Sequence, residues 1–396
     1  MNKEKNTRIA YFAGTMRPGH DGVTRVLYKL IEELNYQDIS NIFFSPLIPT
    51  DDKQSTDMFK IPSIRFPLYK GYRIAMPGIR HFEQILNDFR PNLLHINSPF
   101  SLGYSAIKYA EKYKIPVVAT YHTHFASYAK YYKIKTLGNM SWTYFKNLYN
   151  RCEKVYVPSK PILKELKNHG LKTIEYLPHG VDIKFFNPMY KSSIWKKSLG
   201  IEGKTVLLYS GRLVWEKDLK TLADTYNILS VYRDDFVFVL VGDGPIKNEL
   251  QKLMPKAIFL GYQSGHALST VYSSSDIFVF PSTTETFGNV TLEAMASGIP
   301  PVCARKGGAS GIIIDGETGL LTKPGDALDL ANKIEVLLDK PKLRNEIAKN
   351  ALKYAQKQTW NKIFNKLFIN YEQVITGYKN KLSNTNYSFL YKLYRY

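Results

Sequence analysis

Short apolar runs alternate with segments of helical periodicity along the first half of the chain. Residues Ile9–Ala13 form the first such run, and after a glycine-containing loop apolar side chains recur on one helical face between residues 23 and 34. This pattern predicts a strand followed by a helix. Further strands are predicted at Ile42–Ser45, Leu93–Ile96, Val117–Tyr121 and Val155–Pro158. Strands that alternate with helices are typical of a parallel sheet covered by helices.

The alternation lapses around residues 179–203 and then starts again. The second series of predicted strands is Thr205–Ser210, Phe236–Val241, Ile258–Leu260, Ile277–Phe280 and Pro301–Ala304. Helical segments such as Leu219–Leu229 lie between them. We therefore predict an α/β protein with two Rossmann-like, doubly wound parallel-sheet domains that face each other across a cleft. Ligands of such sheets bind at the carboxyl ends of the strands.

The pattern also suggests where the two domains begin and end. We expect an N-terminal domain at residues 1–188 and a C-terminal domain at residues 189–359. A long amphipathic helix at residues 360–378 is expected to pack back on the N-terminal domain. Residues 379–396 are expected to form a basic, aromatic tail.

Composition supports a globular protein of this size. The 396 residues are enough for two domains with their own cores, and 44% of them are hydrophobic. Cys152 and Cys303 are too few for a zinc cluster or a disulfide framework. Neither a signal-peptide core nor a run of about 18 uninterrupted apolar residues occurs. We expect a cytoplasmic protein that does not span a membrane.

The formal charge of +20 attracts polyanions, which include nucleic acid, anionic lipid and acidic substrates. Three stretches lack acidic residues and interleave basic residues with aromatic ones: residues 58–82, 112–152 and 378–396. Their basic residues include Lys60, Arg65, Lys70, Arg73, Arg80, Lys130, Lys133, Lys135, Lys146, Arg151, Lys379, Lys381, Lys392 and Arg395. This mixture suits an anionic membrane surface. A lysine-rich, solvated surface without a partner is the alternative.

The most informative chemical pattern lies in residues 285–293, ETFGNVTLE. Glu285 and Glu293 flank a glycine-bearing turn between a buried strand and a helix. The free backbone N–H groups at a helix start favour an anion, so this junction indicates a phosphorylated ligand. A carboxylate near a helix start also stabilises the helix dipole, which is the structural alternative for Glu293.

Other candidate residues follow other predicted strands. Arg212 and Lys217 come just after one strand and can neutralise a diphosphate, or they form a surface pair near Glu216. Because no Asp-x-Asp pair occurs, we expect no metal and no other cofactor. His122 and His124 follow the strand at Val117–Tyr121 and are expected to point into the cleft. Either histidine could instead be an ordinary structural one.

The first glycine loop argues against a dinucleotide cofactor. Its glycines do not spell G-x-G-x-x-G, and no suitable acidic residue follows the next strand, so NAD binding is disfavoured. Gly22 opens the predicted helix. It either lets the backbone approach a donor ligand or serves only as a helix-start glycine.

The ordered motifs together resemble a known family. In chain order they are GTMRPGHDGV, YHTH, PHGVD, SGRLVWEKDL, VGDGP, ETFGNVTLEAMASGIPPV and DGETGLL. This set resembles the retaining, nucleotide-sugar-dependent glycosyltransferases of GT-B architecture that carry the E-x7-E motif, a family 4-like group. Within that group the sequence is most similar to the branch of GDP-mannose-dependent mannosyltransferases and diacylglycerol glycosyltransferases.

The resemblance implies a role for each matching residue. Arg212 and Lys217 would hold the donor diphosphate, and Glu285 would contact hydroxyls of the hexose. Backbone N–H groups of Phe287, Gly288, Asn289 and Val290 would bind the phosphates, and Glu293 would bind the ribose. His122 would hydrogen-bond the donor sugar near its anomeric carbon, whereas the resemblance gives His124 no role. Asp21-Gly22 replaces the paired glycines common in the wider group, so the donor contact of Gly22 is less well supported.

Three functional hypotheses follow. The first is a hexosyltransferase that moves mannose or glucose from GDP-mannose or a UDP-hexose to a lipid or lipid-linked acceptor, peripheral on the inner face of the cell membrane. The second has the same chemistry but a saccharide acceptor of a capsule or wall polysaccharide. The third is a non-enzymatic, basic nucleotide- or nucleic-acid-binding protein. The motif set argues against the third, so we expect no nucleic-acid partner. A UDP-sugar epimerase ranks low because its extra acid/base carboxylates are not recognisable.

Overall fold

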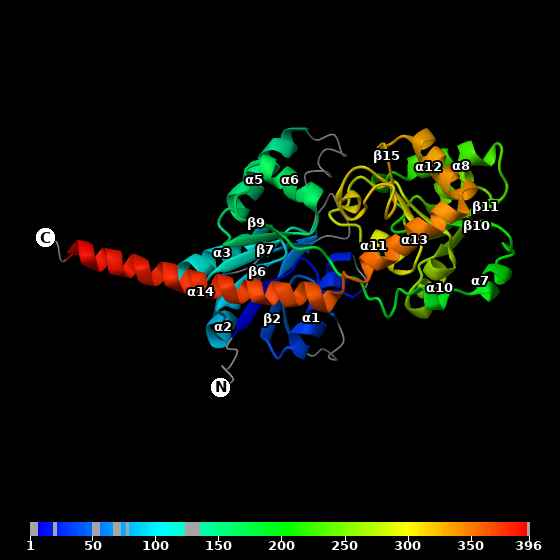
Figure 1. Ribbon diagram of the computed structural model, residues 1–396. Helices are drawn as coiled ribbons and strands as arrows, with labels where there is room; N and C mark the ends of the chain where they lie inside the picture. Colours follow the sequence, from blue (N-terminus) through cyan, green and yellow to red (C-terminus); the bar gives the residue numbers. More distant parts are fainter. Residues whose placement is uncertain are drawn as a thin grey trace.

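Two parallel sheets, one in each half of the chain, form the framework of the fold (Figure 1). The computed structural model describes residues 7–18, 22–49, 56–65, 73–76, 79–122 and 135–393. Within these ranges side chains are described except at residues 79–81, 135–141 and 385–393.

The N-terminal sheet has seven strands in the order β3-β2-β1-β6-β7-β8-β9, and every pair is parallel. The strands are β1 (Arg8–Phe12), β2 (Ser40–Ser45), β3 (Asp57–Lys60), β6 (Leu93–Ile96), β7 (Val117–Thr120), β8 (Lys154–Val157) and β9 (Ile174–Tyr176). A separate antiparallel ribbon consists of β4 (Ser63–Arg65) and β5 (Arg73–Ala75). The strand order reverses between β1 and β6, and ligands of open α/β sheets bind at such a point.

Helices cover both faces of this sheet and bury two apolar clusters. On one face α1 (Gly22–Tyr36) buries Leu27 and Leu30 against β1. The other face is covered by α2 (Ile79–Phe89), α3 (Ser101–Tyr113), α5 (Lys135–Tyr149) and α6 (Lys160–Asn168). Apolar side chains at helical spacing therefore form these helices and attach them to the sheet.

The last helix, α14 (Trp360–Leu393), returns from the C-terminal half and lies against the N-terminal half (Figure 1). Its residues Phe364 and Tyr371 share a cluster with β1 and α1. The Tyr371 hydroxyl lies 2.5 Å from Nδ1 of the buried His95. The helix extends past residue 378, where we expected it to end, because neither glycine nor proline follows Gly377 to stop it.

The C-terminal sheet has six parallel strands in the order β12-β11-β10-β13-β14-β15. They are β10 (Thr205–Ser210), β11 (Phe236–Val241), β12 (Ile258–Gly261), β13 (Ile277–Phe280), β14 (Pro301–Ala304) and β15 (Leu320–Thr322). The surrounding helices are α7 (Ser193–Ser198), α8 (Leu219–Ser230), α9 (Lys247–Leu253), α10 (Gly265–Ser274), α11 (Asn289–Ala296), α12 (Ala327–Asp339) and α13 (Pro341–Ala355). Short 3-10 turns occur at η1 (Pro188–Tyr190), η2 (Trp215–Lys217) and η3 (Gly308–Ile312). The order reverses between β10 and β13.

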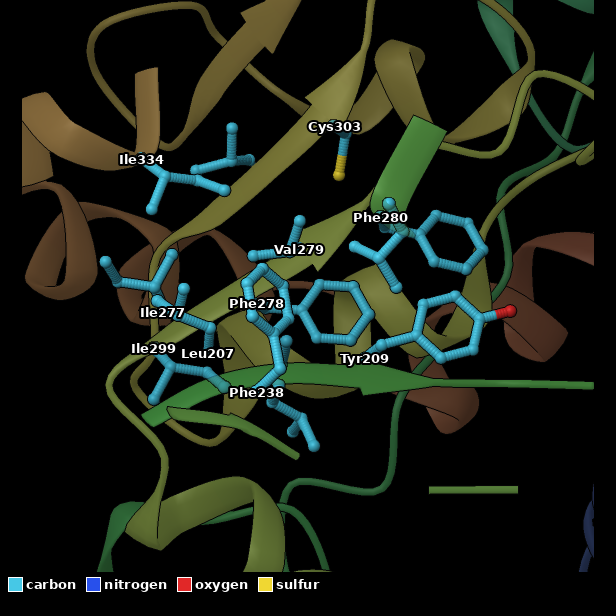
Figure 2. Packing of buried hydrophobic residues seen from close by; sticks show 14 of the residues in the cluster. Leu207, Tyr209, Phe238, Ile277, Phe278, Val279, Phe280, Ile299, Cys303 and Ile334 are labelled. Atoms are coloured by element: carbon cyan, nitrogen blue, oxygen red, sulfur yellow. The ribbon is translucent and has the colours of Figure 1, made fainter. Parts of the chain in front are cut away.

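The core of this half is a single apolar cluster around the two central strands (Figure 2). The rings of Tyr209 and Phe280 stack with centroids 5.9 Å apart, and those of Phe278 and Phe280 stack at 5.7 Å. Such packing makes β10 and β13 a rigid support for the loops at their carboxyl ends.

These two parallel sheets confirm the predicted fold class. Three strands of the parallel sheets had no counterpart in the prediction: β3, β9 and β15, each with three or four residues. Two of them, β3 and β9, contain no fully buried residue, so they lack the apolar run that identifies a buried strand.

The expected membrane-facing residues are only partly covered by the structure. Lys70, Lys130, Lys133 and Arg395 lie outside the described residues. Of the helices that the structure describes, none has both the length and the apolar content needed to cross a bilayer.

Candidate active site

The candidate site begins at the point where the C-terminal sheet reverses its strand order. Strands β10 and β13 are neighbours, and their carboxyl ends meet at one edge of the sheet. Arg212 and Lys217 follow β10, and Glu285 follows β13. The topology therefore brings Glu285 close to Arg212 and Lys217, although Lys217 and Glu285 lie 68 positions apart in sequence.

Lys217 and Glu285 form the central contact of the site. Lys217 Nζ lies 2.6 Å from Glu285 Oε1, and the two side chains are 14% and 24% exposed. A charged pair that is partly removed from water contributes little net stability, because desolvation offsets much of the attraction. The fold therefore gains little stability from the pair.

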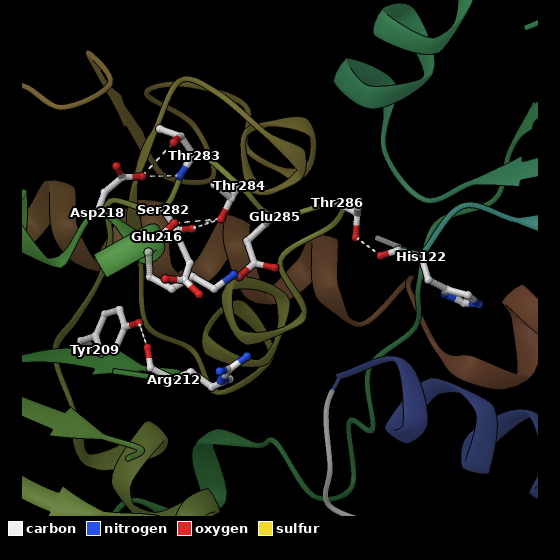
Figure 3. A network of polar contacts seen from close by, with 11 residues as sticks. His122, Tyr209, Arg212, Glu216, Asp218, Ser282, Thr283, Thr284, Glu285 and Thr286 are labelled. Atoms are coloured by element: carbon white, nitrogen blue, oxygen red, sulfur yellow. Dashed lines mark hydrogen bonds and ion pairs between the residues drawn. The ribbon is translucent and has the colours of Figure 1, made fainter. Parts of the chain in front are cut away.

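Hydrogen bonds between the two loops hold this pair in place (Figure 3). One carboxylate oxygen of Asp218, Oδ2, accepts from both the backbone N–H and the hydroxyl of Thr283, each at 2.8 Å. The hydroxyl of Thr284 donates to the carbonyl of Glu216 at 3.0 Å. These residues were not predicted as part of the site, although the acidic residues beside Lys217 and the threonine pair before Glu285 were a visible signal.

Arg212 belongs to the same cluster. The Tyr209 hydroxyl donates to the Arg212 carbonyl at 3.0 Å. The pKa of Tyr209 is raised well above 10, chiefly by burial, and the charges of Glu285 and Arg212 both act on this hydroxyl. Arg212, Lys217 and Glu285 thus lie at one edge of the C-terminal sheet.

A third loop, after β14, holds the backbone of Glu285. The backbone N–H of Gly308 donates to the Glu285 carbonyl at 2.6 Å. A Cβ at position 308 would lie 2.1 Å from the carbonyl carbon and oxygen of Thr286, so only glycine fits. This support was also not predicted, and the signal for it is the pair Gly307-Gly308, which is separated from the buried strand β14 by two residues.

The loop after Glu285 leads into α11. Phe287 is buried in the core, and Val290 is half-buried against it. Between them Gly288 has φ +94°, a left-handed conformation that favours glycine, and Asn289 begins the helix. Gly288 offers no capping side chain, and the N–H groups of Thr291 and Leu292 donate to its carbonyl.

Glu293 lies one turn further along α11 and is buried. The Tyr272 hydroxyl donates to its Oε2 at 3.1 Å, and Arg25 Nη1 lies 2.8 Å from its Oε1. Burial and the charge of Glu293 raise the pKa of Tyr272 well above 10, so its hydroxyl keeps the proton that it donates. Arg25 comes from α1, in the other half of the chain, and was not among the predicted residues.

The two halves meet at the candidate site through further polar contacts. The Thr286 hydroxyl donates to the His122 carbonyl at 2.7 Å, and His122 Nε2 donates to Asn97 Oδ1 at 2.8 Å. Asn97 and His122 follow β6 and β7 and so lie at the carboxyl edge of the N-terminal sheet. His124 lies outside the described residues.

Asn289 at the start of α11 contacts His179 at the domain junction and lies close to Gly22 at the start of α1. His179 Nδ1 donates to Asn289 Oδ1 at 2.8 Å, and burial lowers the pKa of His179 to about 4, which keeps the ring neutral at neutral pH. A Cβ at Gly22 would lie 3.7 Å from Asn289 Nδ2, so the start of α1 faces the start of α11.

Across the described part of the chain, His, Cys, Asp and Glu side chains form no group of three or more that could hold a metal ion.

The chain is similar to known proteins over most of its length. Residues 20–185 match the family described as Glycosyltransferase Family 4, and residues 191–354 match Glycosyl transferases group 1. A GDP-mannose-dependent alpha-mannosyltransferase of Corynebacterium glutamicum is 32% identical over 93% of this chain and 89% of its own length. An alpha-monoglucosyldiacylglycerol synthase of Streptococcus pneumoniae is 28% identical over 74% of this chain and 70% of its own length.

Solved structures show the same architecture. Anabaena HepE in complex with UDP superposes with a TM-score of 0.76 at 20% identity and covers 93% of this chain and 100% of its own. Two facing Rossmann-like domains define the GT-B class of glycosyltransferases. The chain belongs to the glycosyltransferases of family 4, and the predicted family, fold and hexosyltransferase activity are confirmed.

Proposed function

We propose that the protein is a retaining hexosyltransferase that moves mannose or glucose from GDP-mannose or a UDP-hexose to a lipid or lipid-linked acceptor. The names of its relatives support this choice, since they include GDP-mannose-dependent mannosyltransferases and monoglucosyldiacylglycerol synthases. The observation that carries the proposal is the partly buried Lys217–Glu285 pair, which lies at the edge where the two sheets face each other.

In this proposal the C-terminal half, residues 189–359, binds the donor. Arg212 and Lys217 hold the diphosphate, and the N–H groups at the start of α11, from Phe287 to Val290, bind its oxygens. Glu285 accepts hydrogen bonds from hexose hydroxyls, and Glu293 accepts them from the ribose. Because Lys217 Nζ lies 2.6 Å from Glu285 Oε1, Lys217 can contact both the diphosphate and the carboxylate that binds the hexose.

The reaction needs no protein nucleophile. The bond between the anomeric carbon and the phosphate oxygen breaks as the acceptor oxygen bonds to the same carbon from the same face. The leaving phosphate takes the acceptor proton. Lys217 and Arg212 stabilise the negative charge that grows on that phosphate, and fixed cations act most strongly where water is excluded. His122 and Gly22 contact the donor from the N-terminal half.

The N-terminal half, residues 1–188, is the proposed acceptor side, and it docks on the inner face of the cell membrane. Lys60, Arg65 and Arg73 lie on β3 and on the β4–β5 ribbon of this half, and Lys379 is exposed on α14. Arg65 and Arg73 are directly paired across the ribbon. Two like charges placed opposite each other are destabilising, so an anionic partner such as a lipid headgroup would relieve them. Each basic residue near anionic lipid contributes about 1 kcal/mol.

One assay tests the reaction and the acceptor together. The enzyme is given labelled GDP-mannose or UDP-glucose with either diacylglycerol in vesicles or a soluble oligosaccharide. We expect label in the lipid product with the anomeric configuration of the donor, read by NMR. Label in the oligosaccharide alone would replace the lipid acceptor by a saccharide one, and an inverted product would exclude the retaining mechanism.

Membrane docking has its own test. The triple charge reversal Lys130→Glu, Lys133→Glu and Lys135→Glu is expected to weaken cosedimentation with anionic vesicles and to leave hydrolysis of the soluble donor unchanged. Unaltered vesicle binding would contradict docking through this stretch.

A further inference from the structure

Arg25 reaches from the N-terminal half to a carboxylate of the proposed donor site. It is the fourth residue of α1, and its Nη1 lies 2.8 Å from Oε1 of Glu293 in α11. The contact joins residues 268 positions apart in sequence. Arg25 thereby acts on the carboxylate that we assign to the ribose.

The contact leaves Glu293 able to bind a ligand. A carboxylate has about four acceptor positions. Tyr272 occupies one on Oε2 and Arg25 occupies one on Oε1. Two positions remain for the neighbouring hydroxyls of a ribose, so Arg25 and the ribose need not compete. Arg25 and Tyr272 instead fix the carboxylate from two sides.

Stability of the fold does not account for the pair. The Arg25 side chain is 60% exposed, but Glu293 is only 8% exposed, so desolvation of the carboxylate offsets much of the attraction and the net energy of the pair is small. The same small energy bears on the arrangement of the two halves, because the pair joins α1 to α11 in addition to the contact of Thr286 with His122. A cation on α1 that needs Glu293 as its partner favours the closed arrangement.

We propose that Arg25 is a positioning residue of the donor site, which acts through Glu293 to couple binding of the donor ribose to closure of the two halves. The inference rests on the proposed function, because it assigns Glu293 to the ribose. It adds a residue of the N-terminal half to the donor site and predicts that donor affinity depends on the contact between the halves.

The test measures binding of GDP and UDP by titration calorimetry to the full-length protein and to Arg25→Ala, Arg25→Lys and Arg25→Gln. For whichever nucleotide binds the unaltered protein, we expect Arg25→Ala and Arg25→Gln to lower affinity about fivefold, equivalent to roughly 1 kcal/mol. Arg25→Lys keeps the charge and is expected to lose about half of that energy. Tm is expected to stay nearly unchanged in all three.

The matched control is Arg305→Ala. Arg305 is 56% exposed and pairs with Asp315 within the C-terminal half, so it resembles Arg25 in exposure and in type of partner. We expect the control to bind the nucleotide with unaltered affinity. An equal loss of affinity in the control would mean that the effect is one of net charge, which would overturn the inference.

A double-mutant cycle separates failure of the inference from failure of the proposed function. Glu293→Ala should weaken nucleotide binding by itself, and adding Arg25→Ala should then have no further effect. Full affinity in Glu293→Ala would refute the ribose assignment and with it the donor site. Weak binding in Glu293→Ala but full affinity in Arg25→Ala would refute only the inference, as would an undiminished effect of Arg25→Ala in the double variant.

Binding of 2′-deoxynucleoside diphosphates supplies an independent readout. A deoxyribose offers one hydroxyl fewer to Glu293, so the penalty for Arg25→Ala is expected to shrink. A penalty that is the same for the ribose and deoxyribose ligands would contradict an action through the ribose carboxylate.

Discussion

The two halves of the molecule build the candidate site in different ways. In the C-terminal half, three loops are joined by hydrogen bonds and an ion pair. Asp218 accepts from Thr283, Lys217 pairs with Glu285, and the Gly308 N–H donates to the Glu285 carbonyl. Among the residues that the structure describes, the N-terminal half contributes the carbonyl of His122, the ring of His179, the start of α1 and the side chain of Arg25.

This difference indicates which half has its site geometry formed before the ligand binds. A network with many mutual contacts keeps its geometry when one ligand leaves, whereas isolated contacts between domains open and close at low cost. We infer that the C-terminal half presents a preformed donor site and that the N-terminal half completes it on closure.

The largest expected effect is that of Lys217→Ala, which removes the cation from the preformed half. We expect kcat to fall by about 10²–10³-fold, the range seen when one group that stabilises a transition-state charge is removed. Initial rates of sugar transfer measure it. Retention of transfer within a few fold of the unaltered rate would contradict the assigned role.

Lys196→Ala is the matched control for that change. Lys196 pairs with Asp276 at 2.7 Å, and the two side chains are 20% and 17% exposed, close to the values for Lys217 and Glu285. Both variants lose one partly buried ion pair of the same half, so we expect similar decreases in Tm. The control should transfer sugar at the unaltered rate.

A smaller effect is expected for Gly308→Ala, which disturbs the loop network without touching a charge. The new Cβ would lie 2.1 Å from the backbone of Thr286, so the loop that carries Glu285 must shift. Overpacking of this kind costs about 1–3 kcal/mol. We expect lower Tm and about tenfold slower transfer.

Gly316→Ala is the control that shows whether steric crowding causes the slower transfer of Gly308→Ala. Gly316 has φ +80°, but a Cβ added there would meet no neighbouring side chain or backbone within 4 Å, so alanine brings backbone strain without a clash. It should lower Tm and leave transfer unchanged. Equal rates for Gly308→Ala and Gly316→Ala would contradict a loop network that must be preformed.

The smallest effect is expected for Thr286→Val, which removes one contact between the halves. The lost hydrogen bond to the His122 carbonyl contributes about 0.5–1.5 kcal/mol, so kcat/KM should fall a few fold. Thr270→Val removes a similar hydrogen bond within α10 and serves as the control. A decrease in activity as large as that of Lys217→Ala would contradict the view that the N-terminal half only completes a preformed site.

Much of the fold was predictable because buried parallel strands leave a clear sequence pattern. The apolar run Phe236–Val241 is fully buried as β11, and Ile277–Phe280 is fully buried as β13. The short strands β3 and β9 are partly exposed, so their composition does not distinguish them from loops. The length of α14 was underestimated because the polar run at residues 383–386 interrupts the apolar spacing after Leu382.

The site was predictable only where a motif marks it. Arg212, Lys217 and Glu285 follow two central strands, and the resemblance to a family assigns them to one place. The contact of Arg25 with Glu293 depends on how α1 and α11 face each other, which no local pattern records. The support of Glu285 by Gly308 depends likewise on backbone distances between two loops.

The central claim is that a preformed donor site in the C-terminal half binds a nucleotide diphosphate through cations and its hexose through Glu285. The most direct measurement is thermal stabilisation by a panel of GDP- and UDP-hexoses and by the free nucleoside diphosphates, for the unaltered protein and for Glu285→Gln. Ligand at 100 times its Kd stabilises by about 2.7 kcal/mol. The account predicts that one nucleotide-hexose raises Tm of the unaltered protein most, and that Glu285→Gln loses the hexose-dependent part while free nucleotide still stabilises it. If no nucleotide or nucleotide sugar raised Tm of the unaltered protein, the claim would be contradicted.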